Sequence, residues 1–196
     1  MERRRFPTEF SPEPLSVCRW LALPPEELLK ACKQARFQGS GPGGQKRNRV
    51  YSGIRLTHEA SGLYVESDAS RESRRNLEDA LHRLRIELAL SVLSEKGGKA
   101  KQPVTTENQD QAWVIESTAA FQHPDFRTQA SPSHVDFPIL ALRAIYFLNK
   151  YDGQIAAAAK SLNCTASALT RFLKLDKTVW TAARRIREAH GLHPLK

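Results

Sequence analysis

The stretch with the clearest capacity for chemistry is a glycine-rich run that ends in an amide side chain and a group of cations. It extends from Gly39 to Gln45 and continues directly into Lys46-Arg47-Asn48-Arg49. Glycines allow backbone conformations and close approaches that a Cβ would block, whereas Pro42 restricts the path of the chain. The run therefore offers mainly backbone N–H groups and the Gln45 amide, next to cations that are suited to contact phosphates.

Two common phosphate-binding motifs share glycines with this run but do not fit its surroundings. Gly39, Gly41 and Gly44 satisfy the G-x-G-x-x-G pattern of dinucleotide-binding folds, which requires a strand before it and a helix after it. Here residues 26–36 are predicted to be largely helical and residues 50–57 to form a strand. A P-loop is excluded because its Gly-Lys-Ser/Thr ending is missing. A glycine turn without catalytic function in a basic protein is the remaining alternative.

The elements that must position this run are a predicted β-hairpin and a long amphipathic helix. Apolar and polar residues alternate over residues 54–58 and again over 63–66, on either side of the turn Ser61-Gly62. From Ser70 to about Leu93, apolar residues recur at three- and four-residue steps, which predicts a helix that covers the sheet. The cations expected on the exposed face of this helix, for RNA contact or for solubility alone, are Arg71, Arg74, Arg75 and Arg85.

Residues 36–80 as a whole resemble the catalytic domain of class I peptide chain release factors and of their shorter, codon-independent ribosome-rescue relatives. The resemblance covers about a quarter of the chain and begins with the signature Ser40-Gly41-Pro42-Gly43-Gly44-Gln45. Its further matches are Asn48, Ile54-Arg55-Leu56-Thr57-His58, Ser61-Gly62, Val65, Arg71, Asn76 and Ala80. Departures from the family pattern are Lys46 and Arg47, in place of a polar and an apolar residue, and Glu72 in place of a serine.

The resemblance implies hydrolysis of the peptidyl-tRNA ester in the ribosomal peptidyl-transferase centre, with Gly43, Gly44 and Gln45 as catalytic residues. The glycines would let the Gln45 N–H stabilise developing negative charge, and the Gln45 side chain would shape a pocket that admits water. Neither a metal nor a cofactor is needed. His58, in the middle of a strand, is predicted to be a packing or hydrogen-bonding residue rather than a base.

The net charge of +9 is distributed unevenly along the chain. Residues 36–101 carry +5 and residues 138–196 carry +7, whereas the connecting residues 102–137 carry −4. This asymmetry predicts a polyanionic partner contacted at two places, RNA or DNA, although solubility is an alternative explanation of a basic pI.

The sequence predicts an α+β protein with four parts. They are an irregular N-terminal arm over residues 1–23, a GGQ catalytic domain over 24–96, an acidic linker over 97–137, and a basic all-α domain over 138–196. Deletion of the last part is expected to leave the catalytic domain folded.

The last 60 residues are predicted to be helical and to contain a helix-turn-helix module. Ile139–Tyr151 forms the first helix, Ala159 suits a close contact between helices, and Asn163 occupies a turn position that favours left-handed backbone. Leu162, Cys164, Leu169 and Phe172 are expected to be buried, and Asp176 to cap a final helix. The stretch resembles the terminal module of Fis-type DNA-binding proteins; a simple helical bundle is the alternative.

The partners expected from these features are ribosomal RNA and peptidyl-tRNA, for a cytoplasmic monomer without membrane contact. The predicted RNA-binding residues are Arg36, Lys46, Arg47, Asn48, Arg49, Arg71, Arg74, Arg75, Arg171, Lys174, Arg184, Arg185 and Arg187. The three cysteines lack C-x-x-C spacing and predict neither a disulfide framework nor a metal site.

Pro103-Val104-Thr105 resembles the P-x-T tripeptide with which some release factors read stop codons. In that family the tripeptide precedes the glycine loop, whereas here it follows the loop, so we interpret the match as chance. Two alternatives to the rescue function stay open: a helix-turn-helix nucleic-acid-binding regulator, and a ribosome-associated factor without hydrolytic activity.

Overall fold

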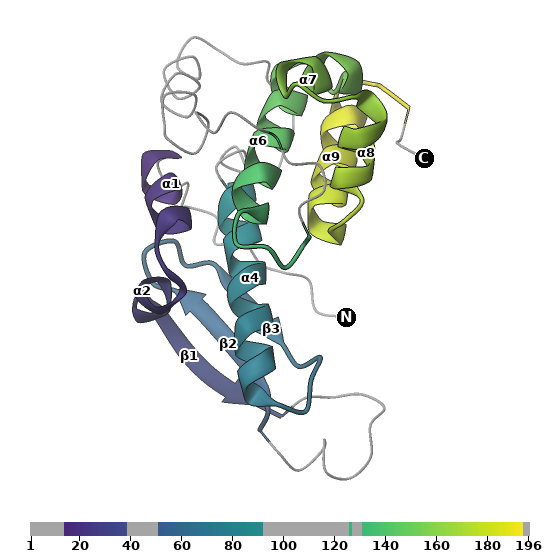
Figure 1. The fold of residues 1–196 in the computed structure, drawn as a ribbon. Helices are drawn as coiled ribbons and strands as arrows, with labels where there is room; N and C mark the ends of the chain where they lie inside the picture. The colour runs from purple at the N-terminus through teal and green to yellow at the C-terminus, as the bar shows by residue number, and fades with distance from the viewer. Residues whose placement is uncertain (1–13, 39–50, 92–125, 127–130, 194–196) are drawn as a thin grey trace.

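The computed structural model describes residues 14–38, 51–91, 126 and 131–193 (Figure 1). Within these residues a small antiparallel sheet and a long helix are followed by a group of helices, which confirms the predicted α+β class. The elements are α1 (Pro14–Ala22), α2 (Pro25–Lys30), β1 (Cys32–Phe37), β2 (Gly53–His58), β3 (Tyr64–Ser67), α4 (Ser73–Ser91), α6 (Phe137–Lys150), α7 (Ile155–Ser161), α8 (Ala166–Leu173) and α9 (Lys177–Ala189). None of the described helices is long and apolar enough to cross a membrane.

The sheet has the order β1-β2-β3, and its β2–β3 hairpin is the one predicted from the alternating pattern. The turn between the strands closes through Gly62, whose N–H donates to the His58 carbonyl at 2.8 Å and whose φ is +64°. A positive φ suits glycine because it lacks the Cβ that would clash. Apolar residues of β2 and β3 are buried with those of α4, so the long helix covers the sheet as expected.

The prediction that residues 26–36 are largely helical is wrong. Helix α2 ends at Lys30, and residues 32–37 form β1, paired with β2 from Cys32 opposite His58 to Phe37 opposite Gly53. The four central side chains of β1 are exposed. Backbone pairing with β2, rather than a buried apolar pattern, therefore holds this strand in place.

The prediction that residues 1–23 form an irregular arm is also wrong for the last part of that range, because residues 14–22 form helix α1. Val17 and Leu21 are buried in the same apolar cluster as the sheet residues. Trp20 places its ring edge against His58, with ring centroids 4.5 Å apart. Trp20 and Leu21 thus hold residues 14–22 against the sheet region as part of a regular helix.

Arg85 is buried rather than exposed, which corrects its predicted place on the solvent face of α4. Its side chain is 5% exposed, and Nη2 donates to the Leu23 carbonyl at 2.5 Å. Leu23 directly follows α1, which packs against α4. Burial lowers the pKa of Arg85 from its usual value, and the carbonyl of Leu23 offsets part of the cost of removing the cation from water.

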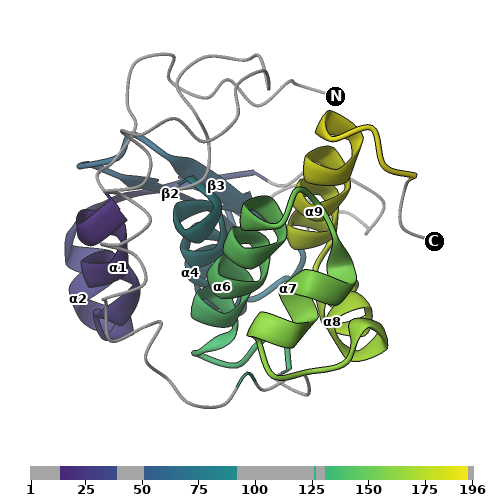
Figure 2. The same ribbon diagram turned by 90° about the horizontal axis from the view of Figure 1, so that it is seen from above.

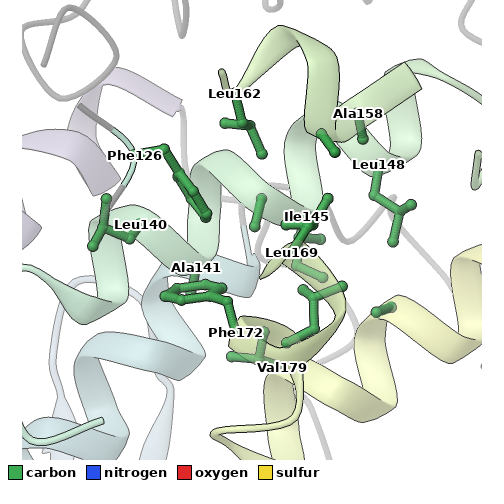
Figure 3. Packing of buried hydrophobic residues seen from close by; sticks show 14 of the residues in the cluster. Phe126, Leu140, Ala141, Ile145, Leu148, Ala158, Leu162, Leu169, Phe172 and Val179 are labelled. Atoms are coloured by element: carbon green, nitrogen blue, oxygen red, sulfur yellow. The ribbon is translucent and has the colours of Figure 1, made fainter. Parts of the chain in front are cut away.

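The C-terminal helices surround a second apolar cluster (Figure 3). In this cluster the centroids of the Phe126 and Phe172 rings are 4.9 Å apart in a T-shaped arrangement, and those of the Phe137 and Phe172 rings are 5.1 Å apart. Phe126 and Phe137 both fall within residues 97–137, which the sequence predicted to be an acidic linker. These two residues therefore belong to the packed core of the helical group.

Helices α4 and α6 lie side by side in both views (Figures 1 and 2) and connect the two apolar clusters. Ile86 of α4 belongs to the C-terminal cluster, and Leu142 of α6 belongs to the cluster under the sheet. The division into separate domains at 24–96 and 138–196 stays a prediction. The shared packing shows that the sheet and the helical group are joined by a continuous apolar interface.

Candidate functional site

The predicted catalytic residues Gly43, Gly44 and Gln45 lie outside the described residues, as do Lys46, Arg47, Asn48 and Arg49. The structure does describe both ends of the segment that carries them. Strand β1 ends at Phe37, strand β2 begins at Gly53, and these two residues are directly opposite each other in the ladder. The segment therefore leaves and rejoins the sheet at a single pair of neighbouring strand ends, which we call the loop base.

The loop base contains a close contact between an aromatic ring and the backbone. A Cβ at Gly53 would lie 2.8–2.9 Å from three carbon atoms of the Phe37 ring. Real Cβ atoms do not approach other atoms so closely, so the ring occupies the space that only glycine leaves free. The residue types at these two positions are therefore matched to each other.

Asn76 ties the first turns of α4 to the loop base. This side chain is fully buried, and its Nδ2 donates to the carbonyls of Ser52 and Ser70, both at 2.8 Å. Its Oδ1 accepts from the Ser70 N–H at 2.8 Å. Figure 1 shows the start of α4 at the same end of the sheet as the end of β1. A single amide thus connects the helix, the turn before it and the residue that precedes β2.

Asn76 is one of the residues that carry the family resemblance, but that resemblance assigns it no role. A signal for that role was present, since Asn76, Ala80, Leu84 and Leu88 recur every fourth residue and therefore share the buried face of α4. A polar residue at such a position must find hydrogen-bonding partners inside the protein. Only the structure identifies those partners.

The predicted RNA-binding arginines that the structure describes in this half of the chain lie around the loop base. Arg36 is exposed on β1 and pairs with Ile54, one step from the Phe37–Gly53 pair. Arg71 is exposed and follows Ser70, which Asn76 holds. Arg74 and Arg75 are exposed in the first turn of α4 and form ion pairs with Glu78 (3.2 Å) and Glu72 (3.0 Å). Exposed pairs of this kind contribute about 0–1 kcal/mol, so phosphates can compete with them.

His58 is a buried hydrogen-bonding residue, as the sequence predicted. Its Nδ1 lies 2.8 Å from the Ser61 Oγ and accepts from the Ser61 N–H at 3.3 Å. Burial lowers the pKa of His58, and the opposing influence of Glu59 is smaller. His58 is the last residue of β2, whereas the sequence predicted it to lie in the middle of a strand. The loop base is at the start of that strand, so His58 is not placed to act on the glycine segment.

The described structure contains no candidate metal centre. Among the described residues, no group of three or more His, Cys, Asp and Glu side chains could hold a metal ion. Cys18, Cys32 and Cys164 form no disulfide. Burial, followed by the charge of Glu59, raises the pKa of Cys32 to about 11, so its thiol is protonated and unreactive at neutral pH.

The C-terminal cations have two different environments. Arg171, Lys174, Arg184 and Arg185 are exposed on α8, just beyond its end, and on α9. Arg187 instead donates from Nη1 to the Gly153 carbonyl at 2.6 Å and from Nε and Nη2 to the His193 carbonyl. Its guanidinium therefore joins the turn between α6 and α7 to the residues that follow α9. A contact of Arg187 with RNA stays a prediction.

Local expectations for the helix-turn-helix stretch are confirmed with one exception. Asn163 has φ +52° between α7 and α8, and Ala159, Leu162, Leu169 and Phe172 are buried. Asp176 caps α9 by accepting from the N–H groups of Thr178 (2.7 Å) and Val179 (3.0 Å). Cys164, predicted to be buried, is only partly so. These features do not distinguish a Fis-type module from another helical bundle, so that resemblance stays a prediction.

We expect Gly53→Ala to destabilise the protein by about 1–3 kcal/mol, because the added methyl forces the Phe37 ring or the strand to move. Thermal unfolding followed by circular dichroism measures the effect. In a Phe37→Ala background the same substitution should cost less, because the obstructing ring is gone. An equal cost in both backgrounds would contradict the contact as the cause.

Comparison with known proteins gives a family match and several partial relatives. The RF-1 domain model matches residues 27–129, slightly more than half of the chain. Peptide chain release factor 2 of Lactiplantibacillus plantarum is 32% identical over 103 residues, 50% of this chain and 27% of that protein. The same factor of Acholeplasma laidlawii is 41% identical over 63 residues, 32% of this chain and 17% of that protein.

In Thermotoga sp., peptide chain release factor 2 is 31% identical over 117 residues, 57% of this chain and 30% of that protein. This chain thus spans less than a third of the length of each of these three relatives. No solved structure matches the chain. Because the RF-1 domain model matches more than half of this chain, the protein belongs to the family of GGQ-containing class I release factor-like proteins.

Proposed function

We propose that this protein hydrolyses the ester bond of peptidyl-tRNA on the ribosome and releases the nascent peptide from stalled complexes without reading a stop codon. The observation that carries the proposal is the RF-1 domain match, which includes the sequence Gly43-Gly44-Gln45. The geometry of the loop base supports it, because both ends of the segment that carries this triplet are held by paired strands and by Asn76.

In this mechanism water attacks the ester carbonyl and the ribose oxygen of the tRNA leaves. The N–H of Gln45 stabilises the negative charge that develops, because a donor already in place needs no reorganisation during the reaction. Its side chain limits the pocket to a nucleophile of the size of water. Arg36, Arg71, Arg74 and Arg75 contact RNA phosphates around the loop base and hold the segment in position.

Release by this protein is independent of the codon in the decoding site. The matched relatives carry the name peptide chain release factor 2, but the alignments cover 17–30% of their length. Pro103-Val104-Thr105 lies outside the described residues, and its position after the glycine segment supports chance as the origin of the match.

We expect equal rates of peptide release from ribosomes whose decoding site holds a stop codon, a sense codon or no messenger. The measurement is release of labelled peptide from defined ribosome complexes at saturating protein, with a stop-codon release factor as the codon-dependent control. Release that occurs only with a stop codon would show that the P-x-T tripeptide has a decoding role.

The C-terminal helices dock on ribosomal RNA or tRNA through Arg171, Lys174, Arg184 and Arg185, and the protein acts as a monomer. Their exposure on neighbouring elements and the net charge of +7 over residues 138–196 support this part of the proposal. A nucleic-acid-binding regulator is the second candidate, favoured by the left-handed Asn163 between α7 and α8. If a Gln45→Ala variant fully replaced the wild-type protein in cells, that result would favour the nucleic-acid-binding regulator.

A further inference from the structure

We infer that Asn76 is a positioning residue for peptide release: it fixes the returning end of the glycine segment against α4 through the carbonyl of Ser52. The inference rests on the proposed function, because the effect on catalysis presupposes that this segment carries the reacting groups. Its geometric part rests only on described residues, Asn76, Ser52 and Ser70.

The ladder between β1 and β2 does not itself extend to Ser52. Pairing ends with Phe37 opposite Gly53, and Ser52 is one residue beyond it on the side of the glycine segment. Ser52 is nevertheless buried, and its carbonyl accepts from the Asn76 Nδ2 at 2.8 Å, across 24 residues of sequence. Asn76 therefore extends control of the backbone one residue past the end of the sheet.

The remaining hydrogen bonds of Asn76 fix its side chain against the turn that precedes α4. Its Oδ1 and its second Nδ2 bond both go to the backbone of Ser70, which fixes the turn that leads into α4. Both amide hydrogens and the amide oxygen thus have partners in a fully buried site. Helix α4 packs against β2, β3 and α6, so the amide is held by a rigid part of the molecule.

Control of Ser52 matters because hydrolysis depends on the placement of groups rather than on a strong base. A displacement of about 1 Å at a reacting centre can lower a rate by roughly 10²-fold. Asn76 carries no charge and contacts no phosphate in this scheme. Its loss should therefore lower the rate of the bound complex and leave the affinity for the ribosome unchanged.

Three variants of the full chain test the inference. Asn76→Ala removes all three bonds of the amide. Ser67→Ala is the matched control, because it removes another hydrogen bond between the sheet and α4, from Ser67 Oγ to Asp79 at 2.6 Å, without touching Ser52. Asn76→Asp keeps the acceptor for the Ser70 N–H but, when ionised, places an oxygen where the donor to Ser52 was.

We expect Asn76→Ala to lower the single-turnover release rate at saturating protein by about 10²-fold. The concentration that gives half of the maximal rate should stay unchanged, and Ser67→Ala should retain the wild-type rate. Asn76→Asp should regain part of its rate relative to wild type as the pH falls, because the protonated carboxyl can again donate to Ser52. Hydrogen exchange at the amides of residues 51–53 should accelerate in Asn76→Ala but not in Ser67→Ala.

A wild-type rate for Asn76→Ala at saturation, or an equal loss in Ser67→Ala, would overturn the inference. Should the wild type release no peptide at all, the proposed function fails by itself, and hydrogen exchange still decides the geometric part. Equal exchange at residues 51–53 in the wild type and Asn76→Ala would then show that the amide does not hold Ser52.

Discussion

Gln45→Ala is expected to lower peptide release by about tenfold or more while the protein stays folded and bound to ribosomes. The substitution removes the side chain that shapes the pocket for water but leaves the cations Lys46, Arg47 and Arg49 in place. Gly44→Ala should be at least as severe, with a loss of about 10²-fold, because a methyl group restricts the backbone that aims the Gln45 N–H.

Single-turnover release of labelled peptide at saturating protein measures both effects, and co-sedimentation with ribosomes measures binding separately. Gln38→Ala is the matched control, since Gln38 is an exposed amide just past the end of β1 and outside the catalytic triplet. Equal release by the wild type and Gln45→Ala would remove the basis for the proposed reaction.

Removal of residues 131–196 is expected to lower the stability of the remaining chain strongly. Ile86 and Leu90 of α4 pack in the C-terminal cluster, and Leu142 of α6 fills part of the cluster under the sheet. Each large apolar side chain uncovered costs about 1.5–3 kcal/mol. This expectation replaces the one drawn from the sequence, that the catalytic domain alone would stay folded after the deletion.

Thermal unfolding of residues 1–130 and of the full chain measures the difference. Comparable midpoints would show that the contact between α4 and α6 adds little to the stability of the sheet region. A large drop would mean that the deletion cannot by itself report on RNA binding by the C-terminal helices, because it also disturbs α4.

A charge-reversal variant separates binding from stability. Arg184→Glu with Arg185→Glu changes two exposed residues of α9 and no buried one, so the fold should persist while ribosome binding weakens and becomes less sensitive to salt. Arg19→Glu with Lys30→Glu is the control with the same change in net charge, made on α1 and α2. Equal affinities of the two variants across a salt titration would exclude a specific role for α9.

The sequence alone was sufficient to predict the features that depend on local patterns of residues. The β2–β3 hairpin follows from alternation and a glycine turn, α4 from its apolar period, and the cap of α9 from an aspartate before a helix. Each can be recognised from a pattern within one short stretch of the sequence. The glycine signature was likewise sufficient to indicate the family, because its residue types at their spacing are specific without any knowledge of the fold.

Tertiary structure decided the features that depend on residues distant in sequence. Lys33-Gln34-Ala35-Arg36 has no strand pattern of its own and becomes part of β1 only because the edge of β2 accepts its backbone. Arg85 meets the Leu23 carbonyl only when the chain around α1 packs on α4, and Asn76 meets Ser52 only when α4 lies on the sheet. The two side-chain contacts join residues 24 and 62 positions apart, and no local pattern specifies which distant groups will meet.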